Sequence, residues 1–284
     1  MIEGQILDEI IAAAPAFLLI ATRALAMIQV APLLNSEAIP QVAKLSLAGF
    51  AAYACFSSAL IKDWVIAPFG ISFIFLVIGE AIIGIIIGFF LSIIFAAFVT
   101  AGQFFSLQMG FGASETFDPL SQIENPLLGQ YLNLVAMLVF VTIDGFRELF
   151  LGGFWRSLQS INVISLVNGR EHIVSMMMAG LSRLFLDAII ISMPILGTLF
   201  LVSLSTGLIS KAAPQINILS EGFPLSIIVA FVTMLAALPF MTEAFSRIIG
   251  SGFRTLHDLY IQIGQRIAVG GSASIGAGVF GGVL

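Results

Sequence analysis

Residues 71–105 read ISFIFLVIGEAIIGIIIGFFLSIIFAAFVTAGQFF and contain a single charged side chain, Glu80. No alternation with a period of two persists along this stretch, which argues against a strand. Because a helix rises about 1.5 Å per residue, the stretch would extend roughly 50 Å, whereas the hydrocarbon core of a bilayer is about 30 Å thick. We therefore predict a helix that tilts, breaks or projects beyond the bilayer into a protein environment.

The rest of the 284-residue chain has the same character. Hydrophobic residues make up 59% of it and charged residues 10%, and its mean hydropathy is +1.10. Soluble domains carry roughly 25% charged residues, so the composition predicts an integral membrane protein. Five further apolar regions lie at about residues 10–34, 45–61, 127–150, 173–209 and 225–249. We predict an all-α, membrane-associated fold of about six long helical regions with kinks.

We expect a single helical domain over residues 1–266. Within it, residues 71–249 contain two similar hairpins, in each of which two apolar regions flank a polar loop that contains proline. Repeated hairpins are common in membrane proteins that build a path between repeats. Residues 267–284 are rich in glycine and carry no charge, which predicts a disordered tail.

Three glycines in the 71–105 stretch, Gly79, Gly84 and Gly88, recur at spacings of five and four residues. On a helix they form a smooth stripe that favours close approach of a second helix. The spacing leaves a second interpretation open, in which glycine is simply tolerated within an apolar span.

The first loop, residues 108–119, reads QMGFGASETFDP and lies between two of the apolar regions. Irregular backbone is not tolerated against lipid, so this loop must reach water, be buried in protein or line a pore. Its glycines permit tight folding, and Met109, Phe111 and Phe117 supply apolar bulk that fits a narrow lumen. The loop indicates gating or passage, and the alternative is an ordinary turn outside the membrane.

Arg23, Glu80, Arg183 and Asp187 are the charges that we expect to be buried, because each lies well inside an apolar region, where charge is costly and faces protein or water. Arg183 and Asp187 are four residues apart and can pair on one helical face. We favour a structural ion pair there over a proton relay, because no further carboxylates continue the series. Arg23 and Glu80 are each isolated; they could pair with one another or with a partner subunit, and we favour a structural hydrogen bond.

Catalytic and cofactor functions find no support in the sequence. His172 and His257 have no cysteine or second histidine at ligand spacing, so we expect no metal site. The chain contains neither a phosphate-binding Gly-Lys-Ser loop nor a Gly-x-Ser-x-Gly elbow. Its net charge of −5 also argues against binding nucleic acid. We therefore expect a protein that is not an enzyme and has no catalytic residues, cofactor or metal.

The two polar loops carry a family resemblance. The second loop reads Ala213-Pro214-Gln215-Ile216-Asn217 and continues with Gly222-Phe223-Pro224; the first contains Gln108-Met109-Gly110, then Asp118-Pro119 and Asn125-Pro126. With this pattern the chain resembles, over about residues 10–260, the FliR family of flagellar type III export-gate subunits and their injectisome counterparts of the SctT type. The second-loop positions that carry the resemblance are Pro214, Gln215, Asn217, Gly222, Phe223 and Pro224.

The resemblance implies a subunit of a hetero-oligomeric, pore-forming helical assembly through which unfolded proteins are exported. It implies FliP-like and FliQ-like membrane partners, and an FlhB-like subunit. The family's plug loop falls on about residues 108–122 here, with Met109, Gly110, Phe111, Gly112, Ser114, Glu115, Phe117 and Asp118 as its expected members. The implied location is the bacterial inner membrane, within the flagellar basal body. Arg247, Arg254 and Arg266 follow the last apolar region and favour a cytoplasmic C-terminus.

A different class of function remains open on the residues alone. A secondary transporter would use a site in the membrane built on Arg183, Asp187 and Glu80. Purification in mild detergent distinguishes the two hypotheses, because a gate subunit is expected to bring several copies of small apolar partners with it.

Overall fold

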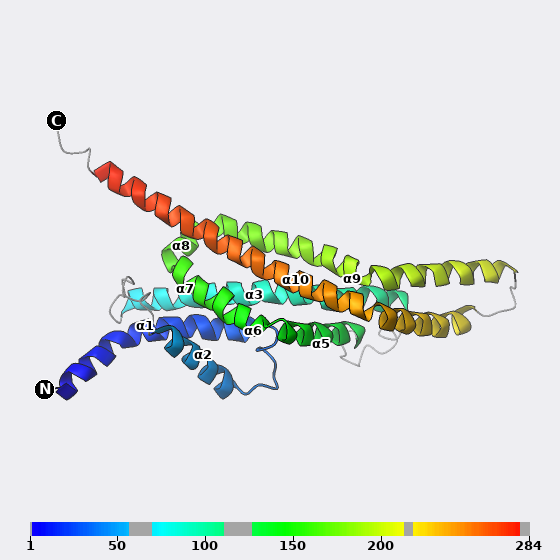
Figure 1. Cartoon of the computed structure of the whole chain (residues 1–284), viewed down its shortest axis with the longest axis horizontal. Helices are drawn as coiled ribbons and strands as arrows, with labels where there is room; N and C mark the ends of the chain where they lie inside the picture. The colour runs from blue at the N-terminus through cyan, green and yellow to red at the C-terminus, as the bar shows by residue number, and fades with distance from the viewer. Residues whose placement is uncertain (1, 57–69, 111–126, 213–217, 279–284) are drawn as a thin grey trace. The chain divides into compact units, whose positions relative to one another are not determined.

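The computed structural model describes residues 2–56, 70–110, 127–212 and 218–278. Every regular element in these residues is a helix, and none is a strand. The long helices are α1 (Ile2–Val30), α2 (Gln41–Phe56), α3 (Ile71–Gln108), α5 (Leu127–Thr142), α9 (Arg170–Ala212) and α10 (Ile218–Gly278) (Figure 1). Each coincides with one of the six predicted apolar regions, so the all-α class is confirmed.

Among the described residues, four helices are long and apolar enough to cross a membrane: residues Ala13–Val30 of α1, the whole of α3 and of α9, and Gly222–Ile263 of α10. Apolar residues dominate these helices and charged residues are few, as expected where lipid or protein, and not water, surrounds a helix. The expectation of a membrane protein is therefore confirmed.

Contacts divide the chain into two compact units. Unit 1 comprises residues 1–92, 144–179 and 251–284, and unit 2 comprises residues 93–143 and 180–250. Each segment of unit 2 contains two helices that flank one of the predicted polar loops. The first segment carries the C-terminal part of α3 and α5, and the second carries most of α9 and the first part of α10.

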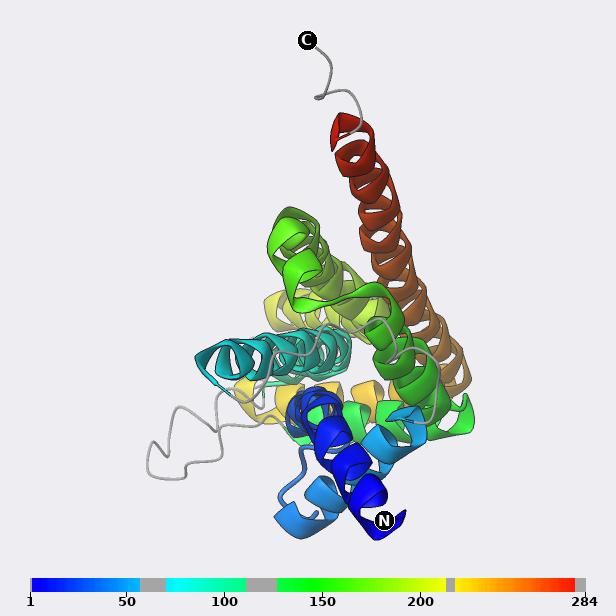
Figure 2. The same cartoon turned by 90° about the vertical axis from the view of Figure 1, so that its left-hand side faces the viewer.

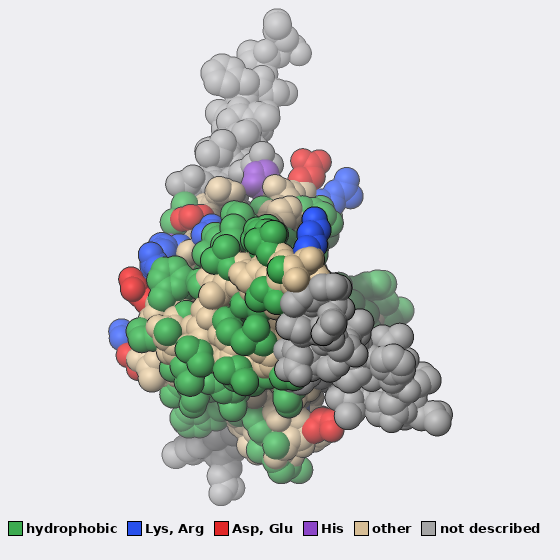
Figure 3. Space-filling model, turned by 90° about the vertical axis from the view of Figure 1, so that its right-hand side faces the viewer, with side chains coloured by type: hydrophobic (Ala, Val, Ile, Leu, Met, Phe, Trp, Pro, Cys, Tyr) green, Lys and Arg blue, Asp and Glu red, His purple; other side chains and the backbone are tan. Residues whose placement is uncertain are grey.

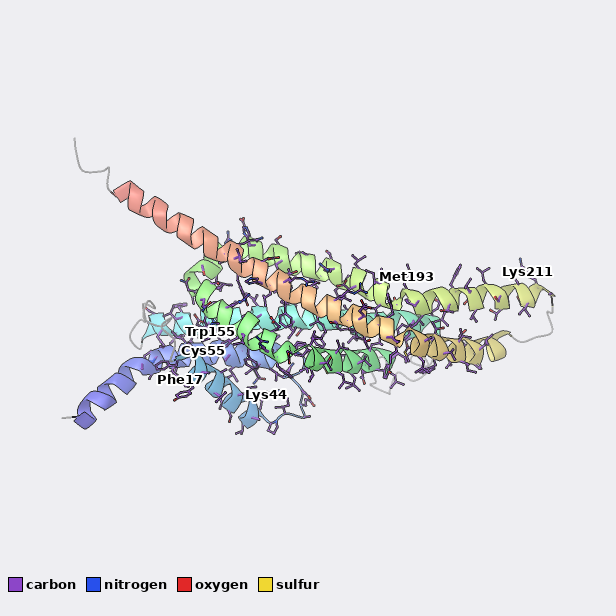
Figure 4. All side chains as sticks on the ribbon, in the orientation of Figure 1. Phe17, Lys44, Cys55, Trp155, Met193 and Lys211 are labelled. Carbon is purple, nitrogen blue, oxygen red and sulfur yellow. The ribbon has the colours of Figure 1, made fainter. Side chains whose placement is uncertain are left out.

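The core of unit 1 is built on α1. Ala24, Met27 and Ile28 are fully buried on this helix, which packs against α2 (Figure 2). At the other end of the α1–α2 contact the rings of Phe17 and Phe56 meet edge to face, with centroids 6.3 Å apart. Phe17 and Cys55 mark this end in Figure 4.

Four phenylalanines hold the helices of unit 2 together. Phe95 of α3 contacts Phe140 of α5, with ring centroids 5.6 Å apart, and Phe98 of α3 contacts Phe245 of α10 at 4.5 Å. All four rings are at most 4% exposed. Aromatic pairs in this range of distances stabilise beyond the area that they bury, so the cluster fixes α5 and α10 on α3.

Two features between α5 and α9 have no counterpart in the predicted pattern. Asp144 adopts a left-handed conformation, with φ 57°, and ends the run of α5. The chain then continues through α6 (Gly145–Arg147), the π-helix η2 (Glu148–Trp155), α7 (Arg156–Ser160) and α8 (Val163–Asn168). The predicted fourth region, 127–150, is therefore divided by this turn. The charged residues Asp144, Arg147 and Glu148 mark the turn in the sequence, and apolar residues such as Leu149 and Phe154 continue after it.

Proline lies inside three of the long helices and supplies the expected kinks. Pro15 is in α1, Pro194 in α9, and Pro224 and Pro239 in α10. Proline cannot donate the helical hydrogen bond and its ring crowds the preceding turn. Figure 4 shows α9 bending near Met193, one residue before Pro194.

Helix α10 continues to Gly278, through residues 267–278 of the glycine-rich tail, where composition predicts no helix. Extending an existing helix costs far less than starting one, so a tail attached to a long helix can follow it.

Many large apolar side chains of the long helices are exposed. Inside the chain, 56% of the apolar window of α3 is buried, but only 33% of that of α9 and 11% of that of α10. Hydrophobic side chains are accordingly spread over the described part of the face in Figure 3, with charged side chains near its edges. The surface of α9 and α10 therefore requires lipid or other protein chains around it.

Candidate functional site

The first predicted loop leaves α3 through a tight and partly buried turn. After α3 ends at Gln108, the Met109 amide donates to the Phe105 carbonyl at 2.9 Å and the Gly110 amide to the Leu107 carbonyl at 3.1 Å. Met109 is 1% exposed, so its side chain is part of the core of unit 2. Gly110 has φ +89°, a conformation that L side chains rarely adopt. The remaining predicted plug residues, Phe111, Gly112, Ser114, Glu115, Phe117 and Asp118, lie outside the described residues.

The second predicted loop meets the first at Gly110. The ring of Phe223, near the start of α10, lies so close that a Cβ atom added to Gly110 would overlap its Cδ1 and Cε1 atoms. Gly222 and Pro224 flank Phe223 in the same helix, whereas Pro214, Gln215 and Asn217 lie outside the described residues. Both loops with the family pattern thus contribute to one contact within unit 2.

A second close approach in unit 2 joins α3 to α5. A Cβ atom on Gly102 would overlap the backbone of Gly129, so only glycine allows the two helices to cross there. The sequence does not predict this pair, because a single glycine in α5 makes no stripe. The sequence signal that could have indicated this crossing is the presence of one glycine in each of two successive apolar helices, Gly102 in α3 and Gly129 in α5.

Arg23 and Glu80 form one buried ion pair in unit 1. Arg23 Nε donates to Glu80 Oε2 at 2.5 Å, and the two residues are 0% and 3% exposed. Arg23 Nη1 also donates to Ser157 Oγ at 3.1 Å and Nη2 to the Ile161 carbonyl at 2.9 Å. The guanidinium therefore joins α1 to α3, to α7 and to the segment that follows α7.

Hydrogen bonds on the π-helix side support this network. Ser157 Oγ donates to the Phe154 carbonyl at 2.6 Å, and the buried Tyr260 hydroxyl donates to the Gly153 carbonyl at 2.9 Å. Buried backbone carbonyls need hydrogen-bond donors, and the hydroxyls of Ser157 and Tyr260 supply them to two carbonyls of η2. Ser157 and Tyr260 were not singled out from the sequence, since a serine or tyrosine in an apolar region has no distinctive pattern.

Arg183 and Asp187 also form a pair, but its surroundings differ from those predicted. Arg183 Nε lies 3.6 Å from Asp187 Oδ2, and the side chains are 56% and 12% exposed. Arg183 was expected to be buried; in this chain it lies on the outer face of α9, next to the exposed Phe185 and Leu186. Glu80, which the transporter hypothesis requires as a free carboxylate, is occupied by Arg23.

The described residues contain no cluster of three His, Cys, Asp or Glu side chains that could hold a metal ion. His257 instead contacts Arg156, with its Nδ1 atom 2.7 Å from Arg156 Nη1. The ion pair of Arg23 with Glu80 and the glycine contacts of α3 thus hold helices together and shape the start of the first loop.

These features define an all-α membrane protein with a buried ion pair in one unit and a close contact between Gly110 and Phe223 in the other. Over residues 14–252 the sequence matches the family described as bacterial export proteins, family 1. The chain belongs to this family, and the resemblance read from its two loops is confirmed.

Comparison with individual proteins supports the same family membership. The chain is 28% identical to the flagellar biosynthetic protein FliR of Bacillus subtilis over 260 residues, which are 91% of this chain and 99% of the relative. It is 29% identical to FliR of Escherichia coli over 245 residues, 85% of this chain and 91% of the relative. It is also 29% identical to the surface presentation of antigens protein SpaR of Shigella sonnei, over 160 residues, 55% of this chain and 59% of the relative. The family is one of export proteins and not of enzymes.

Proposed function

We propose that this chain is a subunit of the export gate of a flagellar-type protein secretion system and forms part of the channel for unfolded substrate proteins. The observation that carries the proposal is the family match over residues 14–252. The long apolar helices, of which α9 and α10 are mostly unburied within the chain, fit a subunit that other chains surround.

Within this channel, residues 108–122 act as the plug. The support is the composition of the loop together with the way the chain enters it. Met109 is anchored in the core of unit 2, and Gly110 follows it in a backbone conformation that L side chains rarely adopt. A loop with an anchored end and apolar side chains can obstruct a narrow passage and move when a substrate enters.

The partners follow from the same assignment. FliP-like and FliQ-like membrane subunits cover the exposed apolar faces, and an FlhB-like subunit joins them. The assembly lies in the bacterial inner membrane, within the flagellar basal body. The C-terminus faces the cytoplasm, as the arginines Arg247 and Arg254 at the end of the last apolar region favour.

A paired experiment tests the gate and the plug. The tagged chain is co-expressed with its FliP-like and FliQ-like subunits, and residues 111–118 are replaced by glycine and serine at constant length. We expect co-purification in both cases and a higher ion conductance across the membrane for the replaced loop. As a control, residues 35–38, an exposed turn after α1, receive the same replacement and should leave conductance unchanged. A chain that purifies alone contradicts the gate, and an assembled loop variant as tight as wild type contradicts the plug.

A further inference from the structure

We propose that the start of α2 binds the phosphate of a phospholipid head group, and that the Lys44 ammonium holds it. This site is separate from the proposed function, because residues 29–45 of unit 1 form it. Lys44 lies in the first turns of α2, near its start in Figure 4, and is 3% exposed. Its side chain nevertheless has no hydrogen bond or ion pair within the part of the chain that the structure describes.

The charge of Lys44 lacks a counterion from its own chain. Glu37 is the nearest acid along the sequence, but the ion pairs among the described residues join other side chains. An unpaired ammonium with so little access to water is costly, so a ligand from outside the chain would stabilise it. Such a ligand can reach it: the described side-chain atom with neither exposed surface nor a partner is Asn133 Oδ1, and not Lys44 Nζ.

The first turn of α2 adds further donors for an anion. The amides of Ala43 and Lys44 donate to the Pro40 carbonyl at 2.9 and 3.2 Å. The amides of Gln41 and Val42 have no partner among the described residues, and the proline that precedes them has no side-chain oxygen to cap the helix. A helical side chain covers the turn that precedes it, so Lys44 extends toward these amides. Free amides at the positive end of a helix, together with an ammonium, favour a bound anion.

The position of the site favours a phospholipid as the source of the phosphate. The candidate membrane span of α1 ends at Val30, and Gln29 Nε2 donates to Gln41 Oε1 at 2.8 Å. The start of α2 therefore lies beside the end of a span, at the level where the head groups of a bilayer lie. Val42 and Leu45, on the outer face of the same turn, are 74% and 61% exposed and offer apolar surface to acyl chains. A free phosphate would use the donors but not this surface.

The test is a titration of the purified protein with phosphatidylglycerol in mild detergent, with bound lipid counted by native mass spectrometry. Lys44→Met keeps an apolar side chain of similar length and removes the charge. It should weaken binding about tenfold, equivalent to about 1.4 kcal/mol. Lys211→Met is the matched control, because Lys211 is an exposed lysine in the last turn of α9 and its loss should leave binding unchanged. Equal weakening by both variants would mean a general attraction of anionic lipid and would reject the site.

A second variant leaves Lys44 in place. Ala43 is exposed at the third position of α2, where an acidic side chain stabilises the start of a helix. Ala43→Glu should therefore fold at least as well as wild type, and its carboxylate should compete with the phosphate for the ammonium and the free amides. We expect weaker binding of phosphatidylglycerol by Ala43→Glu and nearly unchanged binding by the uncharged Ala43→Gln. Equal binding by these two variants would overturn the proposal.

Two further outcomes would assign the ammonium to a different ligand. Displacement of the lipid by an excess of inorganic phosphate would mean a site for free phosphate, and the lipid assignment would be wrong. A complex that takes up no phosphatidylglycerol, but assembles poorly as Lys44→Met, would place a carboxylate of a partner subunit on Lys44 and would also overturn the proposal. The titration applies to the full chain with or without partners, so its result does not depend on the export gate.

Discussion

At the scale of single residues, Arg23 is the fully buried charge of unit 1, and a guanidinium with no exposed surface must find its hydrogen-bond partners inside the protein. Glu80, Ser157 and the Ile161 carbonyl receive its hydrogen bonds. Breaking such a buried pair costs more than the pair contributes over an apolar alternative, since the remaining charge stays buried and unpaired. Arg23 therefore ties the position of α1 to the correct placement of three other segments.

We predict that Glu80→Ala lowers the free energy of unfolding by about 3–5 kcal/mol, whereas Arg23→Met combined with Glu80→Leu recovers most of that loss. Unfolding of the purified complex by a denaturing detergent measures both. The matched comparison is Asp187→Ala, whose partner Arg183 is largely exposed; it should cost less than about 1 kcal/mol. A double variant no more stable than Glu80→Ala would show that the ion pair itself, and not the unpaired charge, governs stability.

Cys55 gives a prediction about pH. It lies on α2, outside the four candidate spans, and burial raises the pKa of its thiol from 9.0 to about 11. Between these values the unfolded chain loses a proton that the folded chain keeps, so the contribution of Cys55 to stability is complete below pH 9 and is lost as pH rises toward 11. Comparing wild type with Cys55→Ala isolates it: the stability difference should shrink over this range. A difference that does not vary with pH would mean that the thiol titrates normally.

At the scale of elements, the crossing of α1 and α3 depends on two glycines. A Cβ atom on Gly84 would overlap the Arg23 carbonyl and lie 2.9 Å from Ala26 Cβ, and one on Gly88 would lie 2.8 Å from the Met27 carbonyl. Backbone atoms cannot move aside as a flexible side chain can. The crossing distance of the two helices, and with it the reach of Arg23 to Glu80, is therefore set by these glycines.

We expect Gly84→Ala to destabilise the protein by about 1–3 kcal/mol, the usual cost of overpacking. Gly49→Ala is the control, because Gly49 lies in the helix α2 with nothing within 4 Å of an added Cβ atom. There alanine should be neutral or stabilise by up to about 1 kcal/mol, through its higher helix propensity. Thermal unfolding of the two variants side by side decides; equal melting temperatures would contradict the close crossing.

The helices themselves could be predicted from the sequence, since long apolar runs and the glycine spacing are local signals. Gly84 and Gly88 do meet α1, while Gly79 faces Val163 after the π-helix. Glu80 was one of the predicted alternatives as the partner of Arg23, whereas Ser157 and Ile161 could not be predicted, because the π-helix and the Asp144 turn bring them to it. Both features arise from packing between distant segments, which periodicity along one segment does not report.

At the scale of the whole molecule, the exposed apolar surface decides how the chain can exist. The apolar windows of α9 and α10 are 33% and 11% buried, and side chains such as Phe200, Leu208 and Leu235 are largely exposed. The spans that contain these windows are 43 residues long in α9 and 42 in α10, more than the roughly 20 residues that a bilayer covers. Lipid alone therefore cannot shield their full length, and the remainder needs other protein chains.

We accordingly predict that the chain expressed alone aggregates or is degraded, and that co-expression with FliP-like and FliQ-like subunits restores a stable, monodisperse complex. Size-exclusion chromatography in mild detergent and the yield of full-length chain measure the difference. The apolar surface is the stated cause, so replacing the exposed Phe200, Leu204 and Leu208 of α9 by serine should improve the behaviour of the isolated chain while weakening its co-purification with partners. A monodisperse monomer of the unmodified chain would contradict the need for partners, because detergent alone would then be enough to shield its long apolar helices.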